Sequence, residues 1–205
     1  REIYLPENQT DEGRKLGLNN VDRDWGLWGH KLARVLPERH SRSVYATIGG
    51  CSNDEQFCFS SNQLFHYIED YIIANYGERR TSRFAILPND NRLVCQCAQC
   101  VAKGCTDTDA APAVFDMIKR LAERFPNHQF FTSQYMSTRS QPRHPMPANT
   151  GVLVSAIRYR LTAIPSKREE EFTNTLKLWT RVTPNVYVWD YINNFDDYFS
   201  PYPIF

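Results

Sequence analysis

The cysteines are the residues whose spacing most clearly suggests chemistry in this chain. Four of the six lie within eleven residues, and three have the spacing C-x-C-x₂-C, namely Cys95, Cys97 and Cys100. Thiolates spaced in this way can point at one centre from a tight loop, which suits a tetrahedral zinc ion. The fourth ligand would then be Cys58, Cys51 or Cys105.

Two other states of the cysteines are open from the sequence. In an oxidising compartment six cysteines could form three disulfides, or the thiols could stay reduced without a partner. Cys95 and Cys97 are poorly placed to pair with each other because a single residue separates them, so a metal explains the clustering better. We therefore expect zinc bound by four thiolates. Such a site is closed, and its role is structural.

Two carboxylates stand at the ends of predicted strands. Asp90 follows Ile86-Leu-Pro-Asn, and Asp190 follows Val186-Tyr-Val-Trp. A carboxyl group at a strand end can donate a proton to a leaving oxygen, and the amide of Asn89 can hold a substrate hydroxyl. The alternative is a turn or capping role, because Pro-Asn-Asp-Asn is also favourable turn chemistry. We expect Asp90 and Asp190 to be catalytic.

Aromatic side chains stand beside these groups, and sugar rings stack on aromatic faces through their C–H groups. The segment Asp24-Trp-Gly-Leu-Trp-Gly-His30 brings tryptophan and histidine to a further strand end. His30 could bind a hydroxyl or take part in proton transfer, and a buried structural histidine is the alternative. The residues expected to contact a ligand are Trp28, His30, Asn89, Tyr135, Trp189 and Tyr191.

Regular elements must hold these residues in place. Short β-branched or aromatic segments bounded by turn residues predict strands at residues 2–5, 25–29, 44–48, 83–87, 129–135, 152–159 and 186–191. Apolar residues at helical spacing predict helices over residues 62–76, 112–125 and 169–181, and two glycines weaken a further helix over residues 11–18. The helix over residues 62–76 has Ser60 and Ser61 as cap candidates and ends at Gly77.

Alternating strands and helices predict an α/β fold with a parallel sheet. A doubly wound open sheet and a (β/α)₈ TIM barrel both fit. No Gly-rich phosphate loop follows a strand, whereas polar and aromatic residues follow several strands, as on the catalytic rim of a barrel. We therefore expect residues 1–205 to form a single TIM-barrel-like domain. We expect an incomplete barrel, because the chain starts at Arg1 without Met and offers six or seven strands.

Composition limits the classes of partner. With 205 residues, of which 41% are hydrophobic and 23% charged, the chain can bury a core and is not of the disordered class. Its 24 basic and 23 acidic residues give a net charge of +1, and no basic patch predicts a nucleic-acid partner. No apolar run reaches the roughly 18 residues of a membrane-spanning helix.

Several of these stretches occur in an order that resembles a known family. They are the segment 24–30, the stretch 56–61, Asn89-Asp90 followed by the C-x-C-x₂-C loop, the segment 188–191 and the segment 201–203. Together they resemble the bacterial family catalogued as domain of unknown function 4838. Its members look like glycoside hydrolases with a barrel core, distantly similar to α-glucuronidases and hexosaminidases. They are typically longer than this chain, and the resemblance implies a secreted or periplasmic protein.

A second resemblance concerns the metal. Some zinc-containing β-galactosidases carry an Asn-Glu acid/base pair at a strand end, a C-x-C-x₂-C loop soon after it, and an upstream zinc cysteine in a Tyr-Cys-x-x-Ser context. Here Asn89-Asp90 stands where Asn-Glu would be, and Phe57-Cys58-Phe-Ser-Ser61 is similar to the upstream piece. This likeness favours Cys58 as the fourth ligand. Asp90 is one methylene shorter than the glutamate of those enzymes.

The residues and the resemblance together lead to one expected function and two alternatives. We expect a glycoside hydrolase that acts on a poly- or oligosaccharide, with Asp90 as general acid and Asp190 as the second carboxylate. The alternatives are a glycan-binding module without turnover and a zinc-braced scaffold domain.

Overall fold

The computed structural model describes Lys15, residues 20–157 and residues 167–190. Its centre is a four-stranded parallel sheet in the order β3-β4-β5-β6. The strands are β3 (Arg83–Ala85), β4 (Gln129–Gln134), β5 (Thr150–Ser155) and β6 (Asn185–Trp189). Each strand therefore pairs with its neighbour in sequence. This confirms the α/β class and the parallel sheet.

Three longer helices accompany the sheet: one precedes β3, one lies between β3 and β4, and one lies between β5 and β6. They are α3 (Asn62–Tyr76), α5 (Ala111–Arg124) and α6 (Lys167–Trp179), each within two residues of the predicted range. The N-terminus of α3 is capped by Ser61, whose Oγ accepts a hydrogen bond from the Leu64 amide at 3.2 Å. Gly77 ends the same helix with a φ of +65°, a conformation that glycine adopts without strain.

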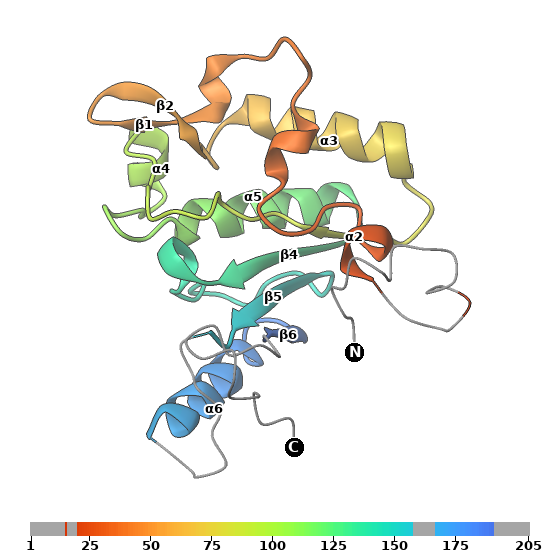
Figure 1. Cartoon of the computed structure of the whole chain (residues 1–205), viewed down its shortest axis with the longest axis vertical. Coiled ribbons are helices and arrows are strands. Elements are labelled where there is room, and N and C mark those ends of the chain that lie inside the picture. Colours follow the sequence, from red (N-terminus) through yellow and green to blue (C-terminus); the bar gives the residue numbers. More distant parts are fainter. Residues whose placement is uncertain (1–14, 16–19, 158–166, 191–205) are drawn as a thin grey trace, which may run out of the picture.

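All three helices pack on one face of the sheet. Phe84 and Phe130 share a core cluster with α3 and α5, while Val152 and Val154 pack against α5 and α6. Figure 1 shows α3 and α5 lying along β4 on the same side. A doubly wound sheet would carry helices on both faces, whereas the three longer helices described here cover one face only. The sheet formed by these residues does not close into a barrel.

The opposite face has a separate, largely aromatic cluster. Trp25, Leu87, Phe131 and Leu153 are buried there, and Trp28 packs against them. A single-turn helix, α2 (Val21–Asp24), precedes this group and buries Val21 in it. Strand β5 has Gly151 on this face, and the Phe131 ring lies where a side chain at position 151 would be. The sheet therefore has a helix-covered face and an aromatic face.

Two predicted strands differ from the structure. Residues 25–29 contribute one parallel bridge, between Leu27 and Phe84, instead of a strand. Residues 44–48 form β1 (Tyr45–Ile48), which pairs antiparallel with β2 (Cys51–Phe57) outside the parallel sheet. Strand β2 was not predicted, although Gly49-Gly50 between two strands is the usual signal of a two-residue hairpin turn. The predicted elements at residues 2–5 and 11–18 lie outside the described residues, apart from Lys15.

The β1–β2 hairpin lies at a defined place relative to the sheet. With the short helix α4 (Ala98–Ala102) it lies toward the end of the sheet at which β4 and β5 finish (Figure 1). Three short 3-10 helices, Leu32–Val35, Arg42–Val44 and Met136–Thr138, complete the described elements. No helix among the described residues is long and apolar enough to cross a membrane.

Candidate functional site

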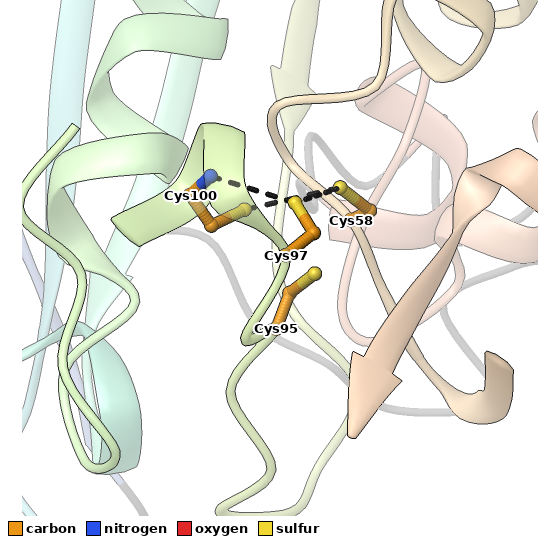
Figure 2. Close-up of side chains that lie close together, drawn as sticks. All are labelled: Cys58, Cys95, Cys97 and Cys100. Atoms are coloured by element: carbon orange, nitrogen blue, oxygen red, sulfur yellow. Dashed lines mark hydrogen bonds between the residues drawn. The ribbon is translucent and has the colours of Figure 1, made fainter. Parts of the chain in front are cut away.

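Four cysteines meet between the hairpin and α4. The sulfurs of Cys58, Cys95, Cys97 and Cys100 all lie within 4.8 Å of one another, and Figure 2 shows them turned toward a common centre. Cys51 is exposed and lies outside this group. Cys105 is buried but is also not among the four. Of the three candidates for the fourth metal ligand, only Cys58 therefore lies in this group.

Local structure places each of these thiols. Cys58 directly follows β2, and its amide donates to the Val44 carbonyl at 2.8 Å. The Gln96 amide donates to the Thr47 carbonyl at 2.7 Å, which holds the C-x-C segment along β1. Cys97 is the N-cap of α4, and its Sγ accepts a hydrogen bond from the Cys100 amide at 3.5 Å. The hairpin and the loop before α4 thus close around the sulfurs.

The distances between sulfurs fit a tetrahedral ion. Cys58 Sγ lies 3.7 Å from Cys97 Sγ and 3.8 Å from Cys100 Sγ. Four sulfurs bound at about 2.3 Å to one zinc ion are about 3.8 Å apart in a regular tetrahedron. The sulfurs are too far apart for disulfides, whose bond length is about 2.0 Å. All six cysteines are free thiols, and four of them could hold a metal ion.

The closeness of four ionisable thiols in the cluster also favours a bound cation. Hydrogen bonds to Cys100 and Cys95, together with burial, raise the pKa of the Cys58 thiol. Hydrogen bonds from Cys105, Cys58 and Cys95 lower the pKa of Cys100. The contacts among the sulfurs therefore oppose ionisation of Cys58 and favour ionisation of Cys100. Four adjacent thiolates in this partly buried place would need a metal ion to balance their charge.

Amide and hydroxyl groups surround the sulfurs. Cys95 Sγ accepts a hydrogen bond from the Thr47 amide at 3.3 Å, and Ser60 Oγ lies 3.2 Å from Cys100 Sγ. Such outer contacts orient metal ligands and favour the thiolate form. Cys58, Cys95 and Cys100 are each at most 5% exposed. The four sulfurs leave no position for a substrate on a tetrahedral ion, so a bound metal would have a structural role.

The hairpin also holds the loop that carries Asp90. Gln56 of β2 is 2% exposed, and its Oε1 accepts a hydrogen bond from the Asn89 amide at 3.0 Å. Gln56 Nε2 donates to Asn91 Oδ1 at 2.9 Å, and Asn89 Nδ2 donates to the Glu55 carbonyl at 2.8 Å. Asp90 itself is exposed, between these two fixed asparagines. The Asn89 amide group, expected to hold a substrate hydroxyl, thus has its Nδ2 bound to the hairpin.

A second group forms at the carboxyl ends of the strands. Trp28 and Trp189 stack with ring centroids 4.8 Å apart and an interplanar angle of 25°. The His30 ring lies 6.4 Å from Trp189 and 6.3 Å from Tyr135. Four of the six residues expected to contact a ligand are therefore contiguous, although they come from three separate parts of the chain. We call Trp28, His30, Tyr135 and Trp189 the rim aromatics.

A cleft of about 770 Å³ opens beside Tyr135. The loops that follow β3, β4 and β5 line it, and they contribute Arg92, Asp109 and Arg139. The carboxylate of Asp109 accepts hydrogen bonds from Ser140 Oγ at 2.6 Å and from the Ala111 amide at 2.9 Å. These cleft residues were not predicted, because single polar residues in irregular loops give no periodic signal.

The two candidate carboxylates lie at the same end of the sheet. Asp90 follows β3 and Asp190 follows β6, and the strands are parallel, so both residues lie beyond carboxyl ends. Both are exposed. Strands β4 and β5 separate them in the sheet. Tyr191 lies outside the described residues.

Comparison with known protein families identifies one family. The chain matches the family described as domain of unknown function (DUF4838) over residues 24–205. That range includes the hairpin, the cysteine cluster and the rim aromatics. Neither the curated proteins nor the solved structures contain a match to this chain. The chain therefore belongs to the DUF4838 family.

Proposed function

We propose that the end of the sheet carrying the rim aromatics binds a carbohydrate and that the protein is a glycoside hydrolase. The observation that carries this proposal is the group of rim aromatics, in which Trp28 stacks on Trp189 and Tyr135 lines an open cleft. Sugars bind through aromatic faces together with polar groups that converge on one cleft. The cleft also lies where enzymes with parallel sheets hold their substrates, beyond the carboxyl ends of the strands.

Hydrolysis would use the two exposed carboxylates. Asp90 would protonate the glycosidic oxygen, and Asp190 would act as nucleophile, base or orienting group. Carboxyl groups about 5–5.5 Å apart predict retention of configuration, and about 6.5–9.5 Å predicts inversion. The placement of both residues beyond carboxyl ends of parallel strands supports the pairing. The sequential strand order and the helices on one face support a (β/α)₈ barrel around this site.

The cysteine cluster would hold zinc and brace the catalytic loop. Four thiolates in a tetrahedral arrangement suit zinc, and iron is the other metal that such a set binds. The metal would fix the C-x-C segment next to β1, while Gln56 of the same hairpin holds Asn89 and Asn91. Asp90 lies between these two asparagines. The metal would therefore act on the reaction through the position of the Asp90 loop.

The test is hydrolysis of a panel of poly- and oligosaccharides by the purified, metal-loaded protein, measured as new reducing ends. We expect turnover of at least one glycan and its loss in the Asp90→Asn variant, which keeps the size of the side chain. Turnover that Asp90→Asn leaves unchanged would remove Asp90 as the acid. Binding of a glycan without turnover by the unmodified protein would favour the binding module.

Elemental analysis of the same preparation tests the metal. We expect one zinc ion per chain and no iron. A metal-free protein with four titratable thiols in this cluster would remove the metal from the proposal while leaving the glycan site to its own test. Elemental analysis and glycan binding test separate parts of the proposal, because the rim aromatics and the cysteines are different residues.

A further inference from the structure

The two ring nitrogens of His30 have different surroundings. Nδ1 lies 2.6 Å from the carbonyl oxygen of Pro88, which follows β3. A carbonyl oxygen only accepts hydrogen bonds, so the hydrogen must be on Nδ1. In the neutral ring this leaves a lone pair on Nε2. Within the part of the chain that the structure describes, Nε2 has no hydrogen-bond partner.

His128 shows what a purely structural histidine looks like in this protein. It is 0% exposed, its Nδ1 accepts from the Ser82 amide at 3.2 Å, and its Nε2 lies 2.6 Å from the Gly77 carbonyl. Both of its ring nitrogens are used, and it joins the end of α3 to the start of the parallel sheet. His30 is half-buried and uses one nitrogen. The Pro88 carbonyl therefore orients the His30 ring through Nδ1 and leaves Nε2 available to bind a ligand.

The surroundings of His30 are those of a ligand site. Its ring neighbours both Tyr135 and Trp189, with an interplanar angle of 29° to Trp189. Trp189 in turn stacks on Trp28. A sugar ring lying on these aromatic faces presents its hydroxyl groups at its edge, beside the imidazole.

We infer that His30 recognises one hydroxyl group of the bound sugar. Nε2 of the neutral imidazole accepts a hydrogen bond from that hydroxyl. The Pro88 carbonyl holds the ring in the tautomer that leaves Nε2 as an acceptor. The inference rests on the proposed carbohydrate site and adds a specificity residue to it. It predicts a preference for ligands with an O–H donor at one ring position over analogues that lack it.

The experiment compares two variants on the best-binding glycan of the panel and on its monodeoxy analogues, by calorimetry. Asn in His30→Asn can donate to Pro88 as Nδ1 does but has no atom at the place of Nε2. Gln in His30→Gln reaches the place of Nε2 with its amide. One neutral hydrogen bond corresponds to about a tenfold change in affinity. His66→Asn, at an exposed position of α3, is the control for loss of an imidazole.

We expect one deoxy analogue to bind the unmodified protein about tenfold more weakly than its parent sugar. His30→Asn should bind parent and analogue equally, and His30→Gln should recover part of the preference. His66→Asn should behave as the unmodified protein does. An unchanged preference in His30→Asn overturns the inference even though the glycan site stands.

A second measurement needs no glycan. In ¹H–¹⁵N spectra of the imidazoles at neutral pH, we expect His30 to carry its hydrogen on Nδ1 and His128 to carry its hydrogen on Nε2. A hydrogen on Nε2 of neutral His30 overturns the inference directly. If no glycan binds the unmodified protein, the proposed function fails and the hydroxyl contact fails with it, while the tautomer result still reports whether the acceptor is there.

Discussion

Trp28 and Trp189 stack at a centroid distance of 4.8 Å although they come from opposite edges of the sheet. Trp28 follows Leu27, which bridges to β3 at one edge, and Trp189 ends β6 at the other. Neighbouring strands are about 4.8 Å apart, so four spacings would separate these backbone positions by about 19 Å in a flat sheet. The sheet must therefore curve strongly, with the aromatic face on its concave side.

The stack itself makes a prediction for ligand binding. Replacing Trp189 by Ala removes one face of the aromatic pair, and we expect the affinity for the bound glycan to fall at least about fivefold, because stacking on an aromatic ring is worth roughly 1 kcal/mol or more. Val188→Ala is the matched control, since position 188 is on the same strand but faces the helix side. Equal affinities for the two variants would contradict the role of the rim aromatics.

Gly151 leaves room for the Phe131 ring on the aromatic face. The ring of Phe131 covers Gly151 and stacks on Tyr187 two strands away, at a centroid distance of 5.2 Å. A methyl group at position 151 would collide with that ring and lie 2.7 Å from the Asn185 carbonyl. We expect Gly151→Ala to lower the free energy of unfolding by about 1–3 kcal/mol, the usual cost of overpacking, measured by urea denaturation.

A second variant tests the cause of that loss. Phe131→Leu frees space above position 151, so the double variant should lose less stability than the sum of the two single variants. Additive losses would place the strain at the Asn185 carbonyl instead of the Phe131 ring.

The cysteine cluster predicts a sharp difference between two serine variants. Cys58→Ser removes a ligand, and we expect loss of the bound metal and a fall in melting temperature of about 10 °C or more, because metal binding contributes directly to folding. Cys51→Ser, at an exposed position of the same hairpin, should keep both metal and melting temperature. Metal retained in Cys58→Ser would mean that the ligand set is different. Elemental analysis and calorimetry measure the two quantities.

The backbone at Met136, beside Tyr135, is strained. Met136 has a φ of +43°, in the left-handed region that side chains disfavour, and it lines the cleft. Glycine relieves that strain and alanine does not, while both remove the same thioether chain. We expect the free energy of unfolding of Met136→Gly to be about 1 kcal/mol higher than that of Met136→Ala. Inside a helix or strand, the alanine variant would be the more stable of the two. Equal stabilities would show that the backbone relaxes in the alanine variant.

The ion pair between Glu69 and Arg124 joins α3 to α5 and predicts a pH dependence. Arg124 Nε lies 2.6 Å from Glu69 Oε1, and this hydrogen bond, with a smaller one from His66, lowers the pKa of Glu69. A carboxyl whose pKa is lower in the folded protein adds stability above its unfolded pKa. That stability is lost as the pH falls through the folded pKa.

We therefore expect Glu69→Gln to lower the free energy of unfolding by up to about 1 kcal/mol at neutral pH, the usual contribution of a surface ion pair. The difference from the unmodified protein should shrink as the pH is lowered toward about 3. Urea unfolding at both pH values measures it. Glu123→Gln breaks a longer pair, 3.8 Å from Lys119, and serves as the control with a smaller effect. If Glu69→Gln lowers the free energy of unfolding equally at both pH values, the loss comes from packing and not from the charge of Glu69.

Local patterns in the sequence were sufficient for much of the fold. The apolar spacing and caps of residues 62–76 predict α3 to the residue, since a helix depends on neighbours three and four positions away. Turn residues and β-branched segments likewise placed β4, β5 and β6 to within a few residues. The C-x-C-x₂-C spacing identified three of the four clustered cysteines, because all three lie on one short segment that ends in α4.

The partners of distant segments were decided only by the tertiary structure. Tyr45–Ile48 looked like a strand of the main sheet, and its pairing with β2 depends on the Gly49-Gly50 turn and on the loop at Gln96. Cys58 joins the cluster because the β1–β2 hairpin folds over α4. The sequence separation between Cys58 and Cys95 does not reveal this contact. The sequence alone determined the kinds of residue at the strand ends. The curvature of the sheet decided that Trp28, His30, Tyr135 and Trp189 meet, because contacts across a concave face depend on strand order and twist.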